Sequence, residues 1–424
     1  MDTAQIISIA IFVVAMALIM SEKVHRALVA IVGAMLVLVL HVVPFDVAVS
    51  HVDFNTLGVL FGMMLFVAVV KLSGLFEFLA IKCARLAHGD PWRIMVLFTI
   101  LTAVLSAFLD NVTTVLLVGP MTLTVCKLLD TSPVPFLVTE ILASNIGGTA
   151  TLIGDPPNIM IGSEAGLTFS DFVMFNAPAV ILIMVATIAV FYFVYGSKLT
   201  ASEESRAEIM ALDEHDCIRD QRLLRISFVM IALVVAGFML HGALGVESSV
   251  IAMSAAGVLL LISREKIEQA LLEVEWTTLT FFAGLFIIVG AMSETGVISM
   301  LAHALIDITG GNTFVMMLVL LIGSAVISSF LDNIPFVATM IPILLTMEST
   351  GMDVMPLWWA LSLGACLGGN GTLIGASANV VLSDISKKNG HEITFAYFAK
   401  TCFPIMLLTV LIAGIYLVVR FPPV

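Results

Sequence analysis

Apolar residues fill most of this chain in long runs that short polar stretches separate. A helix of about 20 apolar residues crosses a lipid bilayer. Most of the runs therefore predict one membrane-spanning helix each, and we expect an all-α, polytopic membrane protein. The runs cover residues 4–20, 27–43, 54–73, 94–129, 134–162, 172–195, 226–242, 249–262, 276–292, 314–347, 356–382 and 401–419.

Two of these runs, 94–129 and 314–347, are too long for one span, and each carries a polar interruption in its middle. The interruptions read Phe-Leu-Asp-Asn-Val-Thr-Thr from residue 108 and Phe-Leu-Asp-Asn-Ile-Pro-Phe from residue 330. We interpret each run as a re-entrant hairpin, whose second arm returns to the side of the membrane from which the first arm came.

Two other runs, 134–162 and 356–382, contain stretches rich in glycine, asparagine and threonine. Glycine and proline destabilise a helix interior. At membrane depth an opened backbone must be satisfied by protein or by a water-lined cavity. Each run therefore predicts a discontinuous transmembrane helix, and a break of this kind indicates a binding site.

The two halves of the chain repeat each other. Gly148 and Asn158 of the first break recur as Gly369 and Asn379 of the second, at one offset (369 − 148 = 221). The hairpin tips repeat at 222 (332 − 110 = 222), since Asp110-Asn111 recurs as Asp332-Asn333. We predict an N-terminal half over 1–195 and a C-terminal half over 226–424, joined by a polar linker over 196–225.

The basic residues predict the orientation of the chain. If the N-terminus lies outside and each hairpin returns to its own side, every Lys and Arg except Arg420 falls at or near the cytoplasmic face, Lys266 included. This asymmetry follows the positive-inside rule. It places the linker in the cytoplasm, Asp53 outside and its repeat mate Glu275 inside. The repeats are thus predicted to be inverted, as in many secondary transporters.

Composition excludes several classes of function. The 424 residues are 60% hydrophobic and only 12% charged, whereas soluble proteins are about a quarter charged. The net charge of −13 gives no basic patch for nucleic acid. The five cysteines form no CxxC pair, so neither a disulfide framework nor a zinc site is indicated. We see no nucleophile–base pair, and we predict no enzyme activity and no cofactor.

The tips and breaks supply the candidate site. Placing a charged residue at the bilayer centre costs at least ~2.5–3.5 kcal/mol of free energy. We therefore expect a function for Asp110, Asp155 and Asp332, which lie in apolar sequence. We predict no resident metal ion, although Na⁺ could bind at the tips and breaks as a coupling ion. The candidate substrate- or ion-binding residues are Asp110, Asn111, Thr113, Asn145, Gly148, Thr149, Thr151, Asp155, Asn158, Asp332, Asn333, Gly369, Asn370, Thr372, Ser377 and Asn379.

Simpler roles for the acidic residues stay open. Aspartate is a good N-cap, so Asp110 and Asp332 could cap the returning hairpin arms, and Asp155 could cap the helix that follows it. In the functional interpretation, Asp110 and Asp155 form a paired acidic site in the first half, and Asp110 carries the coupling. Glu140 either belongs to a proton path or pairs with a nearby threonine. Cys366 either contacts a thiophilic ion or packs.

The second tip, from Leu331 to Phe336, and the run from Gly364 to Val381 resemble the ion transporter superfamily. Within it they are most similar to the ArsB/NhaD permease group with its P-protein-like members, and the resemblance extends over residues 27–420. It implies a scaffold part and a transport part in each half. It also implies a multi-pass protein of the inner or plasma membrane, a homodimer whose transport parts move like an elevator.

The tips also bear on the substrate. Among the dicarboxylate symporters of the superfamily each tip reads Ser-Asn-Thr, whereas here the tips read Asp110-Asn-Val and Asp332-Asn-Ile. A fixed carboxylate repels a dicarboxylate. We therefore expect a secondary transporter driven by a H⁺ or Na⁺ gradient, of arsenite/antimonite-efflux or Na⁺/H⁺-antiporter type. Two alternatives stay open: an anion or carboxylate transporter or channel, and a membrane sensor or subunit that transports nothing.

Overall fold

The structure, a computed structural model, describes residues 2–21, 23–196, 198–264 and 267–423, so Lys266 lies outside the described residues. All regular elements in these ranges are helices. Seven of the described helices are long and apolar enough to cross a membrane, or eight if the pair α16 (Val297–Thr309) and α17 (Thr313–Ser328), bent by 114°, counts as one span. The prediction of an all-α, polytopic membrane protein is confirmed.

The described part of the N-terminal half contains ten α-helices. They are α1 (Thr3–Ser21), α2 (Arg26–Val39), α3 (Phe45–Ser50), α4 (Phe54–Lys71), α5 (Leu75–Leu86), α6 (Pro91–Ser106), α7 (Asn111–Leu128), α8 (Val134–Gly148), α9 (Pro156–Ala165) and α10 (Phe169–Phe191), the last extended by a π-helical turn over Tyr192–Gly196.

The linker contributes the short helix α11 (Glu203–Ala211) and a 3-10 turn over Glu214–Cys217. The C-terminal half continues with α12 (Gln221–Leu244), α13 (Ser248–Ser263), α14 (Ile267–Leu272), α15 (Trp276–Glu294), α16 (Val297–Thr309), α17 (Thr313–Ser328), α18 (Asn333–Ser349), α19 (Met355–Gly368), α20 (Ser377–Lys388) and α21 (Phe395–Arg420).

The order of helices α1–α10 recurs as α12–α21, and the two halves exchange packing partners. Helix α2 packs on α15 of the other half, and α13 packs on α4. A glycine permits both contacts. A Cβ atom at Gly62 of α4 would lie 2.7 Å from the backbone of Ala252, and one at Gly284 of α15 would lie 2.7 Å from the backbone of Ala30. Small residues allow transmembrane helices this close approach.

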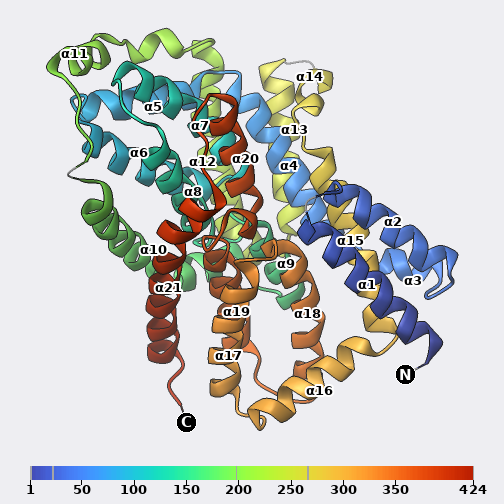
Figure 1. The fold of residues 1–424 in the computed structure, drawn as a ribbon. Coiled ribbons are helices and arrows are strands. Elements are labelled where there is room, and N and C mark those ends of the chain that lie inside the picture. The colour runs from blue at the N-terminus through green and yellow to red at the C-terminus, as the bar shows by residue number, and fades with distance from the viewer. Residues whose placement is uncertain (1, 22, 197, 265–266, 424) are drawn as a thin grey trace.

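The two hairpins approach the centre of the molecule from opposite sides. Figure 1 shows α7 and α20 in the upper part of the view, and α17 and α18 in the lower part. Helix α7 packs on α20, and α18 packs on α9, so each hairpin lies against the broken helix of the other half. The repeats are therefore inverted relative to each other, as the sequence predicts.

One pair of short helices, α5 and α16, escapes the prediction from apolar runs. Helices α5 and α16 follow Gly74 and Gly296, whose backbones are left-handed with φ of +81° and +76°. Glycine adopts this conformation without the steric cost of a Cβ atom. The two helices occupy equivalent places in the repeats, and each leads into the first arm of a hairpin.

The linker is also more ordered than a solvated connection. Arg219 and Glu77 are 3.0 Å apart, Arg206 and Asp90 are 3.4 Å apart, and Arg85 pairs with Glu214. The backbone N–H of Arg219 donates to the carbonyl of Ser73 at 3.1 Å. The linker therefore docks on α5 and on the start of α6, which the sequence does not reveal.

The predicted orientation can be tested at two exposed acidic residues, Asp216 in the linker and Glu247 before α13. With the partly exposed Cys83 and Cys217 replaced by serine, Asp216→Cys should react with an impermeant thiol reagent only after the cells are permeabilised, whereas Glu247→Cys should react in intact cells. Labelling of position 216, but not of position 247, in intact cells would show that the orientation is reversed.

Candidate functional site

The two hairpin tips have the same construction. Helix α7 begins after Asp110, whose carboxylate accepts from the backbone N–H of Thr113 at 2.9 Å and from its hydroxyl. Helix α18 begins after Asp332, whose carboxylate accepts from the N–H of Ile334 at 3.1 Å. Both aspartates are thus N-caps. The capping interpretation is confirmed for these two residues, and any ion binding by them is an additional role.

Asp155 differs from these two caps. It precedes α9 and is fully buried, yet its side chain caps no backbone N–H among the described residues. Instead, the side-chain amide of Asn111 donates to Oδ1 at 3.3 Å, and that of Asn333 donates to Oδ2 at 3.2 Å. The capping interpretation is therefore wrong for Asp155. Both hairpin tips meet on this one carboxylate, and the equivalent position of the second half is Ala376.

Each helix break is closed by its own asparagine. The amide of Asn158 donates to the carbonyls of Thr151 at 3.0 Å and Thr149 at 3.3 Å. The amide of Asn379 donates to the carbonyls of Gly369 at 2.7 Å and Thr372 at 2.9 Å. These bonds satisfy carbonyls that the interrupted helices leave open. The two asparagines thus shape the breaks, whether or not they also contact an ion.

Threonines join the breaks to the tips. The hydroxyl of Thr151 donates to the carbonyl of Ala107 beside the first tip, and that of Thr372 donates to the carbonyl of Ser329 beside the second. The hydroxyl of Thr149 stays within its own helix end and donates to the carbonyl of Asn145 at 2.7 Å. Each tip is therefore hydrogen-bonded to the helix break of its own half.

A chain of asparagines connects the two halves. The amide of Asn111 donates to Asn145 at 3.2 Å. The amide of Asn145 in turn donates to Asn370 and Asn379 of the second half, both at 2.9 Å. Cys366 occupies the position equivalent to Asn145 and makes the equivalent contact, since its sulfur lies 3.6 Å from Oδ1 of Asn158. Candidate residues from all four motifs are thus joined in one polar network.

Arg26 enters this network from outside the four motifs. It begins α2, and its Nη1 lies 3.0 Å from Oδ2 of Asp332 and also contacts the hydroxyl of Ser377. Ser377 itself donates to Asp332 at 2.7 Å. The sequence places Arg26 only at the cytoplasmic end of an apolar run. Its role depends on a partner 306 positions away.

Glu275 is the second residue that the motifs do not contain. It accepts from the hydroxyl of Thr278 at 3.0 Å and lines the same small cavity as Arg26, Asp110, Asp155 and Asn333. The one available signal is that Glu275 is the repeat mate of the acidic residue Asp53. Counted with Asp332, four carboxyl groups and one guanidinium converge here. The cluster is negative if all of them are ionised.

Glu140 lies apart from this cluster, buried between α7 and α8. One carboxyl oxygen accepts from the hydroxyl of Thr122, and the other has no hydrogen-bond partner in the described part of the chain. Pairing with a threonine is thus confirmed, and the proton path stays a prediction.

The glycines at the breaks permit a test of the site's packing. A Cβ atom at Gly148 would lie 2.5 Å from the carbonyl oxygen of Gly154, a backbone atom that cannot move easily. At Gly369 the nearest atom is the Cβ of Ala376 at 3.1 Å. We expect Gly148→Ala to lower transport by about tenfold or more and Gly369→Ala to have a smaller effect. Flux measured in proteoliposomes and thermal unfolding of the purified variants would check this.

Gly257 provides the matched control, because no described atom lies within 4 Å of a Cβ atom placed there. Gly257→Ala should leave both flux and unfolding unchanged. Equal tolerance at positions 148 and 257 would show that the break does not need its close backbone approach.

Comparison with known proteins places this geometry in a family. Residues 16–364 match the family described as citrate transporter. The chain belongs to this family. An uncharacterized transporter of Mycobacterium bovis is 44% identical, with 98% of each chain covered. The P protein of Homo sapiens is 33% identical over 99% of this chain and 60% of its own length.

A solved structure shows the same fold. The YdaH transporter of Alcanivorax borkumensis, described as having an unusual topology, superimposes with a TM-score of 0.66 at 15% identity, over 94% of this chain and 99% of its own. Together the comparisons identify a membrane transporter of the citrate transporter family with P-protein-like relatives. They do not single out the ArsB/NhaD group that the motifs resemble.

Proposed function

We propose that this protein is a secondary active transporter of the cell membrane, driven by a H⁺ or Na⁺ gradient, whose coupling cation binds at Asp155. The observation that carries the proposal is the buried carboxylate on which both hairpin tips converge. Asp155 has no cationic side chain bonded to it among the described residues, since Arg26 bonds Asp332. An unpaired buried carboxylate is costly, and a bound H⁺ or Na⁺ would remove that cost.

The arrangement also supports coupling. Asn111 and Asn333 belong to opposite hairpins, and both donate to the same acid. Occupancy of Asp155 by a cation would therefore change the contacts of both tips at once. A ligand shifts a conformational equilibrium only through such a difference in contacts. We infer an elevator-like movement of the tips and breaks against the scaffold helices within a homodimer, without enzyme activity or cofactor.

On charge grounds, the substrate class that fits the cluster is a cation or a neutral species. This supports a transporter of Na⁺/H⁺-antiporter or arsenite/antimonite-efflux type. Four carboxyl groups around one guanidinium would repel a polyanion unless protons or metal ions accompany it.

A carboxylate substrate is the second candidate, and two observations favour it. Arg26 neutralises Asp332, so the tip acids oppose an anion less than the sequence indicates. The N-terminal ends of α7, α18 and α20 also lie at the central cavity, through Asn111, Asn333 and Ser377. Helix N-termini favour negative groups. The family's description as citrate transporter agrees with this candidate.

The experiment is flux into proteoliposomes with imposed pH or Na⁺ gradients, using arsenite, antimonite, Na⁺ and citrate in parallel. Uphill accumulation that follows one of the imposed gradients is the expected result. Downhill flux that ignores both gradients would indicate a channel. The absence of flux for all four substrates in a correctly inserted protein would support the sensor or subunit instead.

A further inference from the structure

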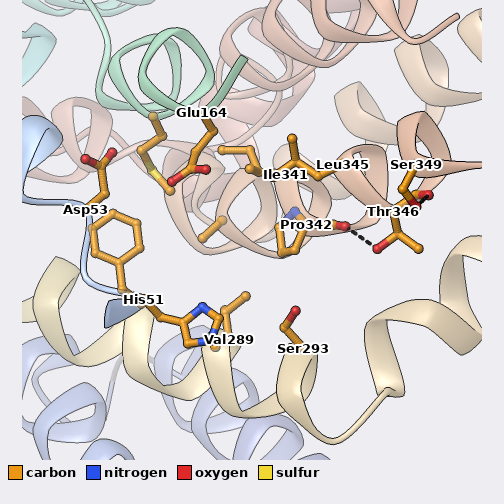
Figure 2. Close-up of a pocket in the computed structure, with 14 residues that line it drawn as sticks. His51, Asp53, Glu164, Val289, Ser293, Ile341, Pro342, Leu345, Thr346 and Ser349 are labelled. Atoms are coloured by element: carbon orange, nitrogen blue, oxygen red, sulfur yellow. Dashed lines mark hydrogen bonds between the residues drawn. The ribbon is translucent and has the colours of Figure 1, made fainter. Parts of the chain in front are cut away.

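A cavity of about 350 Å³ lies between α9, α15 and α18, apart from the central cluster (Figure 2). Figure 2 shows the carboxylates of Asp53 and Glu164 at one end, with Ser293 of α15 and Thr346 of α18 along its sides. Its apolar lining includes Met160, Phe286, Val289 and Ile341. None of these residues belongs to the predicted site.

The cavity continues the faces that line the central site. On α9, Pro156 lines the central cavity, while Met160 and Glu164 line the larger one. On α18, Ile334 lines the first and Ala338 the second. Residues four apart lie on the same face of a helix. The same faces of these two helices therefore extend from Asp155 to the open cavity.

Helix α15 lines both cavities together with α9 and α18, and one of its aromatic side chains lies between them. Thr278 lines the central cavity and Phe286 the larger one. Phe282 lies midway between them on this face, is fully buried, and has its ring centroid 6.0 Å from that of Phe286. The opposite face packs on α2, where Ile288 fills the space beside Gly33. Phe282 therefore lies on the face of α15 that is turned away from α2, between the residues that line the two cavities.

We propose that the seam between α9, α15 and α18 is the access path to Asp155 from the face that carries Asp53 and Glu164, and that Phe282 closes it. The inference rests on the proposed cation-coupled transport. The entrance suits a cation, because the carboxylates of Asp53 and Glu164 line the cavity, and among the described residues the one other titratable side chain that lines it is His51, whose Nε2 lies 3.0 Å from Glu294. A mouth lined by one sign of charge raises the local concentration of opposite ions.

The first test modifies the cavity wall. In a background with Cys83 and Cys217, the two partly exposed cysteines, replaced by serine, Ser293→Cys is treated with a positively charged, impermeant methanethiosulfonate reagent. Reaction should block flux from the side of Glu164. Glu247→Cys, which is exposed outside the cavity, should react without loss of flux. Full flux after complete modification of Ser293→Cys would overturn the proposal.

The second test opens the proposed closure. Phe282→Ala should raise the rate at which the same reagent modifies Thr278→Cys from that face by about tenfold, because the side chain that separates the two cavities is gone. Ile288→Ala removes an equally buried side chain from the opposite face of α15 and should leave the rate unchanged. Equal rates in both variants would overturn the assignment of Phe282.

The outcome of the second test does not depend on the coupling ion, because the rate of modification is measured without transport. If Phe282→Ala accelerates the modification while flux ignores the H⁺ and Na⁺ gradients, the access path stands and the proposed coupling fails. If flux follows a gradient and the rate of modification is unaffected, the coupling stands and the path is wrong.

Discussion

Asp155→Asn is expected to abolish gradient-driven transport while the protein still folds and inserts. Asparagine keeps the size of the side chain and one acceptor oxygen for the amides of Asn111 and Asn333, which lie 3.2–3.3 Å from the carboxylate. It removes the negative charge that a coupling H⁺ or Na⁺ would neutralise. Because the lost charge is buried, folding should suffer little, whereas coupled flux should fall by about 100-fold or more.

The measurement is flux into proteoliposomes across a range of pH, with insertion and thermal unfolding checked in parallel. The pH dependence of any residual flux should flatten. Asp110→Asn is the matched comparison: Asp110 lines the same cavity but caps α7, and asparagine caps about as well as aspartate, so flux should fall less than in Asp155→Asn. Wild-type flux with wild-type pH dependence in Asp155→Asn would exclude this residue as the coupling site.

This expectation reverses an assignment made from the sequence. From the sequence, Asp110 is the acid predicted to carry the coupling, and Asp155 is equally well explained as a helix cap. An aspartate before two prolines at the start of a helix usually caps it. Only the hydrogen bond from Asn333, 178 positions away, shows that this carboxylate bonds a hairpin tip and not the helix that follows it. Contacts over such separations leave no local signal in a single sequence.

The fold was more accessible, because its signals are local. Asp110 and Asp332 predict where the second hairpin arms begin, and α7 and α18 begin one residue later. The glycines and prolines of the breaks predict the interruptions that lie between α8 and α9 and between α19 and α20. These residues act through backbone conformation, which depends little on the rest of the chain.

The prediction weakens wherever an element depends on its neighbours. Helices α5 and α16 are 12 and 13 residues long, too short to be recognised as apolar spans. Their stability comes from packing in equivalent places of the two repeats. The docking of the linker likewise rests on ion pairs such as Arg219 with Glu77, whose partners are 142 positions apart.

The second large effect concerns Arg26. Arg26→Gln leaves Asp332 without its cation beside Asp155, Asp110 and Glu275. Removing one partner of a buried ion pair costs ~3–5 kcal/mol. The cost should be smaller here, about 2 kcal/mol, because the side chains of Arg26 and Asp332 keep 25% and 14% of their surface exposed. We expect a clear loss of thermal stability together with a loss of flux.

The double variant Arg26→Gln/Asp332→Asn separates the charge pair from the substrate. It removes both charges, so no unpaired carboxylate remains at the tip, and asparagine still caps α18. Thermal stability should therefore recover most of what Arg26→Gln alone loses. Equal stability of the single and double variants would show that the pair contributes nothing and that Arg26 acts elsewhere.

The same double variant distinguishes the two substrate classes, because its flux is no longer limited by a loss of stability. If the substrate is a cation or a neutral species, Arg26 serves only to balance Asp332, and flux should recover together with stability. If the substrate is a carboxylate, Arg26 is the cation nearest to it, and citrate flux should stay lost in both variants. Arg26→Lys supplies the control, since lysine keeps the charge but cannot bond Asp332 and Ser377 in the planar geometry of a guanidinium.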